Sequence, residues 1–133
     1  MIRAFSSLGC EELELDEVFA LAAKHAVAAV ELRALGGTID LAEYFERNFG
    51  TPARLAERVT ASGIAVVGLD ASCRLIADDR EGEAELLALA PWAESLGGIP
   101  IRVFDGGENL SDAEISMGLR RWDWWQEQRK QNG

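Results

Sequence analysis

The sequence has 133 residues, and its 13 Lys and Arg side chains against 23 Asp and Glu side chains leave a formal net charge of −10. This length suits one domain with one hydrophobic core, and 48% hydrophobic against 27% charged residues is a globular rather than a disordered composition. Such acidity argues against a nucleic-acid or anionic-membrane surface, because both kinds of surface need clustered Lys and Arg.

Membrane and export signals are missing from the sequence. It contains no run of about 18 apolar residues, and its first residues lack the apolar segment of a signal peptide. Cys10 and Cys73 are too few for a disulfide framework. We therefore expect a cytoplasmic protein that forms one domain over residues 1–133 and carries two free thiols.

Short β-rich runs alternate with helical patterns along the chain. Strands are predicted over residues 2–5, 27–32, 64–69 and 99–104. After the first strand, Leu15, Val18, Phe19 and Ala22 follow helical spacing, and Asp16 is a candidate cap or first-turn carboxylate. Each strand is thus followed by at least one helix.

Capping signals mark the later helices. Asp40 and Ser111 each begin a capping box, and Thr51 followed by Pro52 begins a helix with proline at its first position. A helix before the fourth strand contains Pro91, which should kink or split it. The last helix is predicted to run to about residue 131.

This alternation predicts a parallel sheet with helical crossovers, either doubly wound or part of a barrel. Charge falls on one side of each strand, as with Glu31 and Arg33, and counting alternate positions places Val66 and Asp70 on one side of the third strand. One-sided charge favours a barrel wall, whose complete form takes about 250 residues. The predicted fold class is α/β: four βα units forming half of a TIM (β/α)8 barrel, with a parallel four-stranded sheet and helices outside.

Polar side chains gather where the predicted strands end. They are Glu31, Arg33, Asp70 and Arg102, together with Ser6, Ser7, Ser72 and Asp105. In a barrel these ends meet at one mouth, where Arg33 and Arg102 could hold a carboxylate or phosphate and Glu31 could contact substrate. The competing interpretation is a structural ion-pair network of the same four charges. His25, the only histidine, lies on the first helix, so neither a Ser–His–Asp triad nor a zinc site is expected.

Three segments together resemble the N-terminal half of a sugar phosphate isomerase/epimerase, a member of the xylose isomerase-like TIM-barrel family. They are residues 29–34 with Gly36 and Gly37 behind them, residues 67–72, and residues 96–98 before residues 101–104. The resemblance implies metal-assisted proton transfer beside a sugar carbonyl, in aldose–ketose isomerisation or epimerisation. It also implies Arg33 and Arg102 as contacts to a small sugar or sugar phosphate.

Members of that family hold a divalent metal such as Mn or Mg through a Glu, Asp, His, Glu set on later strands. The resemblance assigns no metal ligand to this chain, which stops where the next strand is expected, so we expect it to be inactive alone. An open half-barrel leaves strand edges and an inner face uncovered. The expected partner is a second copy or a separately encoded C-terminal half-barrel, with self-association the leading case.

Two alternatives to a half-isomerase remain open at this point. One is a non-catalytic half-barrel module for interaction or dimerisation, and the other is a doubly wound small-ligand binder. On the last helix, Ile115, Leu119, Trp122 and Arg129 are predicted to face inward, with Met117 and Trp124 roughly opposite. An exposed aromatic patch on the Trp124 side would be a partner surface.

Overall fold

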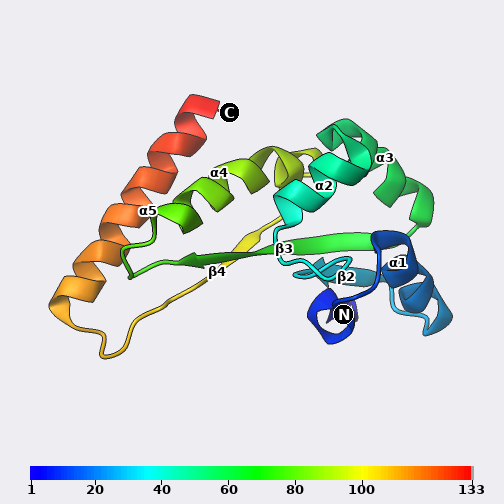
Figure 1. Ribbon diagram of the computed structural model, residues 1–133, viewed down its shortest axis with the longest axis horizontal. Helices are drawn as coiled ribbons and strands as arrows, with labels where there is room; N and C mark the ends of the chain where they lie inside the picture. The colour runs from blue at the N-terminus through cyan, green and yellow to red at the C-terminus, as the bar shows by residue number, and fades with distance from the viewer. Residues whose placement is uncertain (133) are drawn as a thin grey trace.

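A four-stranded parallel sheet organises the chain in the computed structural model, which describes residues 1–132 (Figure 1). The strands β1 (Ala4–Ser6), β2 (Ala29–Leu32), β3 (Ala65–Arg74) and β4 (Ile101–Phe104) neighbour one another in chain order. The helices are η1 (Ser7–Cys10), α1 (Leu15–Lys24), α2 (Leu41–Phe49), α3 (Pro52–Ser62), α4 (Arg80–Ser95) and α5 (Asp112–Asn132). All neighbouring strands are parallel, which confirms the predicted α/β class and its four-stranded parallel sheet.

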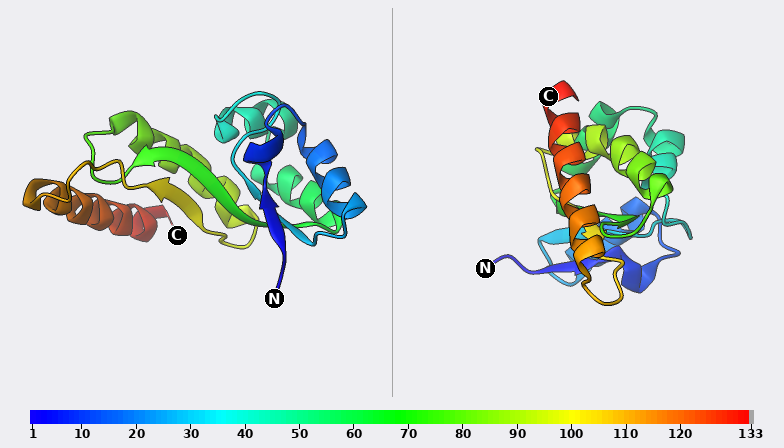
Figure 2. Two further views of the ribbon diagram at one scale, coloured as in Figure 1. Left: turned by 90° about the horizontal axis from the view of Figure 1, so that it is seen from below. Right: turned by 90° about the vertical axis from the view of Figure 1, so that its left-hand side faces the viewer.

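Helices α1 to α4 share one hydrophobic core with the sheet. The strand residues Val30, Leu32 and Leu69 are buried in one cluster with Phe45 of α2 and Leu89 of α4. Helices α2, α3 and α4 stand together on one side of the strands (Figures 1 and 2). A doubly wound sheet would bury apolar residues of both parities, whereas here the other parity of the strands carries charge.

A shift in strand pairing decides which residues of β3 face the helices. Val30 of β2 pairs with Val66, but the next residue, Glu31, pairs with Gly68, so Val67 is an extra residue. Val66 and Leu69 therefore both join the core cluster. The prediction that Val66 and Asp70 share a side is wrong, because a bulge reverses the alternation beyond it.

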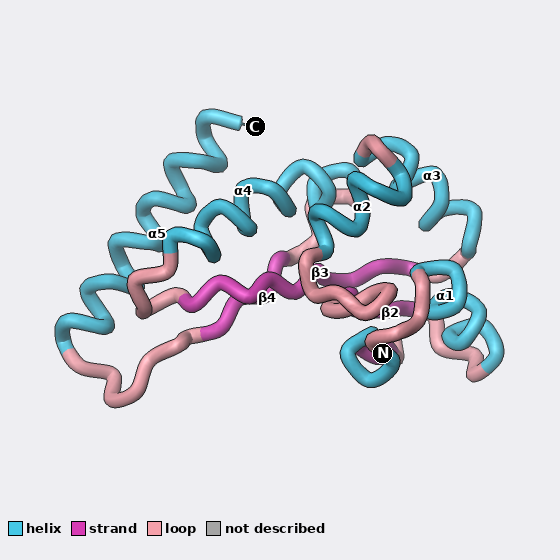
Figure 3. Tube along the Cα trace, in the orientation of Figure 1, coloured by secondary structure: helices cyan, strands magenta, loops and turns pink. Residues whose placement is uncertain are grey.

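Strand β3 is longer than predicted and continues through the middle of the molecule to Arg74 (Figure 3). Its added half still alternates: Ala71 and Cys73 are buried in the core, while Asp70 and Ser72 lie on the other parity. Pairing with β4 extends β3 beyond residue 69, since Asp70 lies opposite Arg102. The sequence prediction ended the strand at residue 69 and placed Asp70 at its carboxyl end.

The predicted capping residues begin their helices. Asp40 and Thr51 each accept a hydrogen bond from the backbone N–H three residues further on. Ser111 and Glu114 exchange hydrogen bonds in a capping box before α5. These local signals were readable in the sequence because a cap needs only residues within one turn of each other.

The structure decides between the two predicted roles of Asp16 in α1, and it differs from the prediction in α4. Helix α1 begins after Glu14, whose backbone N–H donates to the Glu17 carboxylate, and Asp16 is a first-turn acid that pairs with Arg58 of α3 at 2.7 Å. Helix α4 runs unbroken through Pro91. Pro91 lies on the exposed side of α4, so the carbonyl that loses its partner there is available to water.

Helix α5 turns a different side inward from the predicted one. Ile115, Leu119 and Trp122 are exposed, whereas Arg121 is buried and Trp124 is packed against the core. The inward stripe predicted from apolar spacing is therefore wrong. The polar anchor of Arg121, described below, orients the helix instead. In the described part of the chain, no helix combines the length and apolarity needed to cross a bilayer.

Candidate functional site

Three strands bring charged side chains together on the side of the sheet away from the core. Arg102 of β4 lies opposite Asp70 of β3, and its Nη2 is 2.8 Å from Asp70 Oδ2. The Nε of Arg102 lies 3.8 Å from Oε1 of Glu31 on β2. The register of the parallel strands places these residues side by side, because Glu31 pairs with Gly68, two residues before Asp70, and Asp70 pairs with Arg102. The prediction that Glu31, Asp70 and Arg102 lie close together is confirmed.

Asp70 is the unusual member of this cluster, because its side chain is completely inaccessible to solvent. Its Oδ1 and Oδ2 meet no hydrogen-bond donor in good geometry, so the contact with Arg102 is an ion pair rather than a directed hydrogen bond. Burial is the main cause that raises the pKa of Asp70 to about 6, and the neighbouring Glu31 carboxyl group raises it further. Arg102 and Arg33 act in the opposite direction.

Asp70 and Glu31 are two carboxyl groups on neighbouring strands, both beside the Arg102 guanidinium. Two nearby carboxylates resist ionising together, because each negative charge disfavours the other. Such a pair can take up or release a proton close to physiological pH, which is the requirement for general acid–base chemistry.

Arg33 has a different role from Arg102, although both were predicted to contact substrate. Arg33 is buried, and its Nη2 donates to the Ser72 hydroxyl at 3.0 Å. The Arg102 side chain is 53% exposed. Both guanidinium groups lie against the Phe104 ring, at 5.7 and 5.8 Å from its centroid. Arg102 is therefore open to a ligand, whereas Arg33 holds the end of β3 in place.

The remaining predicted mouth residues separate in the structure. Ser7 is buried, and its hydroxyl accepts hydrogen bonds from the backbone N–H groups of Arg33 and Ala34. Ser6 caps η1, and Asp105 is exposed and accepts a bond from its neighbour Gly106. Ser6, Ser7 and Asp105 thus support local structure, and only Ser72 joins the charged cluster.

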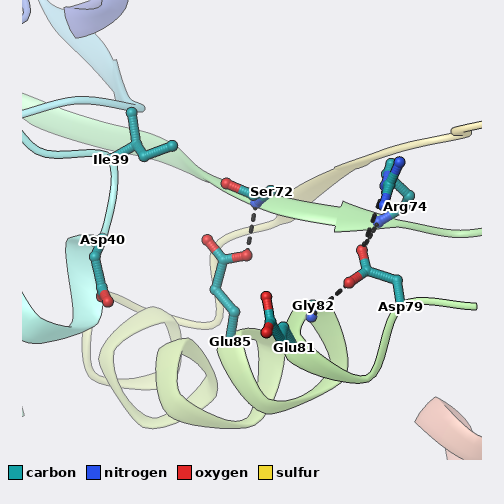
Figure 4. A pocket seen from close by; sticks show the side chains of 8 residues that line it. All are labelled: Ile39, Asp40, Ser72, Arg74, Asp79, Glu81, Gly82 and Glu85. Atoms are coloured by element: carbon teal, nitrogen blue, oxygen red, sulfur yellow. Dashed lines mark hydrogen bonds and ion pairs between the residues drawn. The ribbon is translucent and has the colours of Figure 1, made fainter.

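A pocket of about 410 Å³ lies beside this cluster, between the start of α2 and the start of α4 (Figure 4). It is lined by Ile39, Asp40, Ser72, Arg74, Asp79, Glu81, Gly82 and Glu85. Glu85 points from α4 toward β3 and accepts a hydrogen bond from the Ser72 N–H at 2.8 Å. Ser72 therefore joins the pocket to Arg33 and the charged cluster.

Two carboxylates of this pocket are held by backbone donors. Burial raises the pKa of Glu85, while the Ser72 N–H opposes that shift. For Asp79, burial is outweighed by the N–H groups of Arg74 and Gly82, which lower its pKa. Sequence analysis missed Glu85 because carboxylates on helices usually face solvent. The Asp79 cap three residues before Gly82 was the signal available.

The charged cluster does not fit the divalent metal that the resemblance implies. Glu31 and Asp70 supply only two carboxyl groups, and the Arg102 guanidinium occupies the position beside both. Across residues 1–132, no group of three or more His, Cys, Asp or Glu side chains is arranged to hold a metal ion. No chemical step at this cluster is therefore assigned to a metal.

Comparison of the chain with protein-family models, curated proteins and solved structures finds no match. The geometry of the residues themselves is accordingly the basis for a functional proposal.

Proposed function

We propose that this chain is a cytoplasmic half-barrel of the sugar phosphate isomerase/epimerase type, whose charged cluster binds a small sugar or sugar phosphate. The observation that carries the proposal is the placement of Glu31 and Asp70 around the exposed guanidinium of Arg102. The one-sided charge of the sheet and the helices on its other side support a barrel wall. The free thiols of Cys10 and Cys73 are in keeping with a reducing compartment.

Each group of the cluster has a chemical counterpart in such a ligand. The planar guanidinium of Arg102 suits two oxygens of a phosphate group. The half-exposed ring of Phe104 offers an apolar surface to the C–H face of a sugar. Glu31, whose side chain is 27% exposed, is the carboxyl group of the cluster that can reach a hydroxyl or C–H group of the ligand, whereas Asp70 is buried behind it.

The cluster by itself is a binding site rather than a complete catalyst. It offers one carboxyl pair, and the metal ligands of the resembled family have no counterpart in it. We propose that a second copy or a separately encoded C-terminal half-barrel supplies the missing groups. The isolated chain is then expected to bind ligand without turning it over.

Calorimetric titration with a pentose 5-phosphate tests this function. We expect the wild-type chain to bind the phosphorylated sugar more tightly than the free sugar, and Arg102→Met to weaken binding at least about tenfold, the value of one charge-assisted contact. Arg120→Met is the matched control, because this exposed arginine lies on α5. Absence of binding by the wild-type chain, or equal loss in both variants, would contradict the proposal.

A non-catalytic interaction module is the second candidate, and the uncovered side of the sheet favours it. Val67 and Phe104 remain 40% and 44% exposed there, and β4 is an edge strand with one unpaired side among the described strands. In that case a second copy or a C-terminal half covers this face. Sedimentation of the Phe104→Glu variant tests it: a lower mass than wild type supports the module, and an unchanged mass contradicts it.

A further inference from the structure

Helix α5 carries an apolar stripe that nothing in the described chain covers. Ile115, Leu119 and Trp122 follow one another at helical spacing and are 48%, 62% and 55% exposed. We call these three residues the α5 stripe. Apolar side chains grouped in this way on a surface indicate a contact with another protein.

Another side of α5 already packs against the rest of the molecule, so the helix cannot turn the stripe inward. Arg121 donates to the backbone carbonyls of Arg74, Leu75 and Ala77 and pairs with Glu83 of α4 at 3.1 Å. These contacts fix the rotation of α5 about its axis. The α5 stripe therefore stays on the outside of the molecule.

We propose that the α5 stripe docks against the same stripe of a second copy, with the two helices antiparallel about a two-fold axis. A two-fold contact is self-complementary, so one surface serves both partners. This surface is separate from the ligand cluster and from the uncovered side of the sheet. The proposal therefore does not depend on the function proposed above.

The charges of the molecule favour a second copy at this surface. The chain carries −10 overall, yet α5 has four acidic and four basic residues and no net charge. Residues 1–111 hold the entire net negative charge. Two copies of the chain therefore repel each other least when they meet through α5.

The order of charges along α5 selects the antiparallel direction. If Ile115 lies opposite Trp122 of the second copy, Arg129 on the same side of the helix lies opposite the segment around Glu108 of that copy. Lys130 follows Arg129, and Asp105 precedes Glu108, so basic residues meet acidic residues at both ends of the contact. A parallel pair would instead place like charges together.

The area of the α5 stripe determines how strongly two copies are expected to associate. Three apolar side chains from each copy and their neighbours bury less than about 1,200 Å², which is the range of weak and transient complexes. We therefore expect dimers to form at micromolar rather than nanomolar concentration.

Sedimentation velocity of the full chain over about two decades of concentration tests the proposal. We expect Leu119→Glu to raise the dimer dissociation constant at least about tenfold. Leu8→Glu is the matched control, because Leu8 is similarly exposed at 51% but lies on η1, and it should leave the constant unchanged. A monomer at every concentration would overturn the proposal, as would a dimer that survives Leu119→Glu and is lost in Phe104→Glu.

A charge exchange tests the antiparallel direction. Arg129→Glu should weaken the dimer, and adding Glu108→Arg to the same chain should restore it, because each contact then regains opposite charges. Failure of the double variant to recover would overturn the arrangement.

Discussion

Asp70 is an acidic residue placed in an environment that disfavours its charge. Its side chain has no access to solvent, and the ion pair with Arg102 offsets part of the cost of burying its charge. A buried ion pair often stabilises a fold little, because removing both charges from water costs as much as their attraction returns. Glu31 adds a second negative charge and increases that cost. This cost is one reason for the proposal that Asp70 belongs to a ligand-binding cluster rather than serving stability alone.

The free energy of unfolding should depend on the protonation of Asp70. The pKa of this group is about 6 in the folded protein and 3.8 in the unfolded chain, so between these values the folded state binds the proton more tightly. The stabilising contribution of Asp70 to the free energy of unfolding is fully present below about pH 4, and it is lost as the pH rises through 6. The loss is on the order of 2 to 3 kcal/mol. Urea titrations of wild type and Asp70→Asn at several pH values measure it as the difference between the two proteins.

The sign of that difference is the decisive result. Wild type should lose stability relative to Asp70→Asn as the pH increases from 4 to 7. Asp78→Asn serves as the control, because Asp78 is exposed and its replacement should leave the pH profile of the wild-type protein in place. A difference between wild type and Asp70→Asn that stays constant with pH would show that the folded state does not favour the protonated acid.

Among the helices, α5 depends most on one polar contact. Its amino-terminal half carries Ile115 and Leu119 on the exposed side, so apolar packing there is limited. Arg121 compensates by donating hydrogen bonds to the segment that joins β3 to α4. One buried guanidinium thereby satisfies carbonyls that lie outside the regular strand and helix pairing.

Arg121→Met should release α5 from the rest of the molecule. The methionine retains the apolar stem but leaves the carbonyls of Arg74, Leu75 and Ala77 without their donor, and Glu83 without its partner. We expect amide hydrogen exchange over residues 112–131 to accelerate at least about tenfold, which equals about 1.4 kcal/mol of local stability. Mass spectrometry of the exchanged peptides measures this.

Arg120→Met is the control for that prediction, since Arg120 precedes Arg121 on the same helix but is exposed. Its exchange profile should match wild type. Equal acceleration in the two variants would mean that α5 is not held by the Arg121 contacts.

At the scale of the whole molecule, one core holds the helices on the sheet. An aromatic group from α2 and α4 lies at its centre: Phe45 packs against Trp92 at 5.4 Å between ring centroids and against Tyr44 at 6.0 Å. These rings are almost completely buried. Since α1, α3 and the strands contribute to the same cluster, the domain should unfold as one cooperative unit.

Two neighbouring leucines of α4 test this view of the core. Leu89 is inaccessible to solvent, whereas Leu87 is 40% exposed. Leu89→Ala should lower the free energy of unfolding by about 2 to 5 kcal/mol, because it removes buried contacts and leaves a cavity. Leu87→Ala should cost less than about 1 kcal/mol, as expected for a surface position. Chemical denaturation measures both, and equal costs would contradict the placement of the core under this side of α4.

The sequence predicted the parts of the fold that depend on neighbouring residues. The caps at Asp40, Thr51 and Ser111 were readable because each cap and its partner lie within one turn of helix. The alternation of strands and helices was readable from apolar spacing. The inward side of α5 was not, because the contacts of Arg121 come from residues more than 40 positions away.

For the candidate site, too, the sequence predicted some features and the tertiary structure decided others. Residue type and position on the predicted strands were enough to select Glu31, Asp70 and Arg102, although the structure places Asp70 inside β3 and Arg102 near the start of β4 rather than at strand ends. The distinct roles of Arg33 and Arg102 were not visible, because both are arginines at strand ends. Burial separates them, and burial depends on what packs around each side chain.

By itself, then, the sequence determined the α/β class, the parallel order of the strands and the charged residue types on one side of the sheet. These follow from local periodicity and chain connectivity, which act between near neighbours. The tertiary structure alone decided the bulge at Val67, the burial of Asp70 and the outward direction of Trp122. Each of these depends on strand pairing or packing between segments far apart in the chain, and no local pattern encodes such contacts.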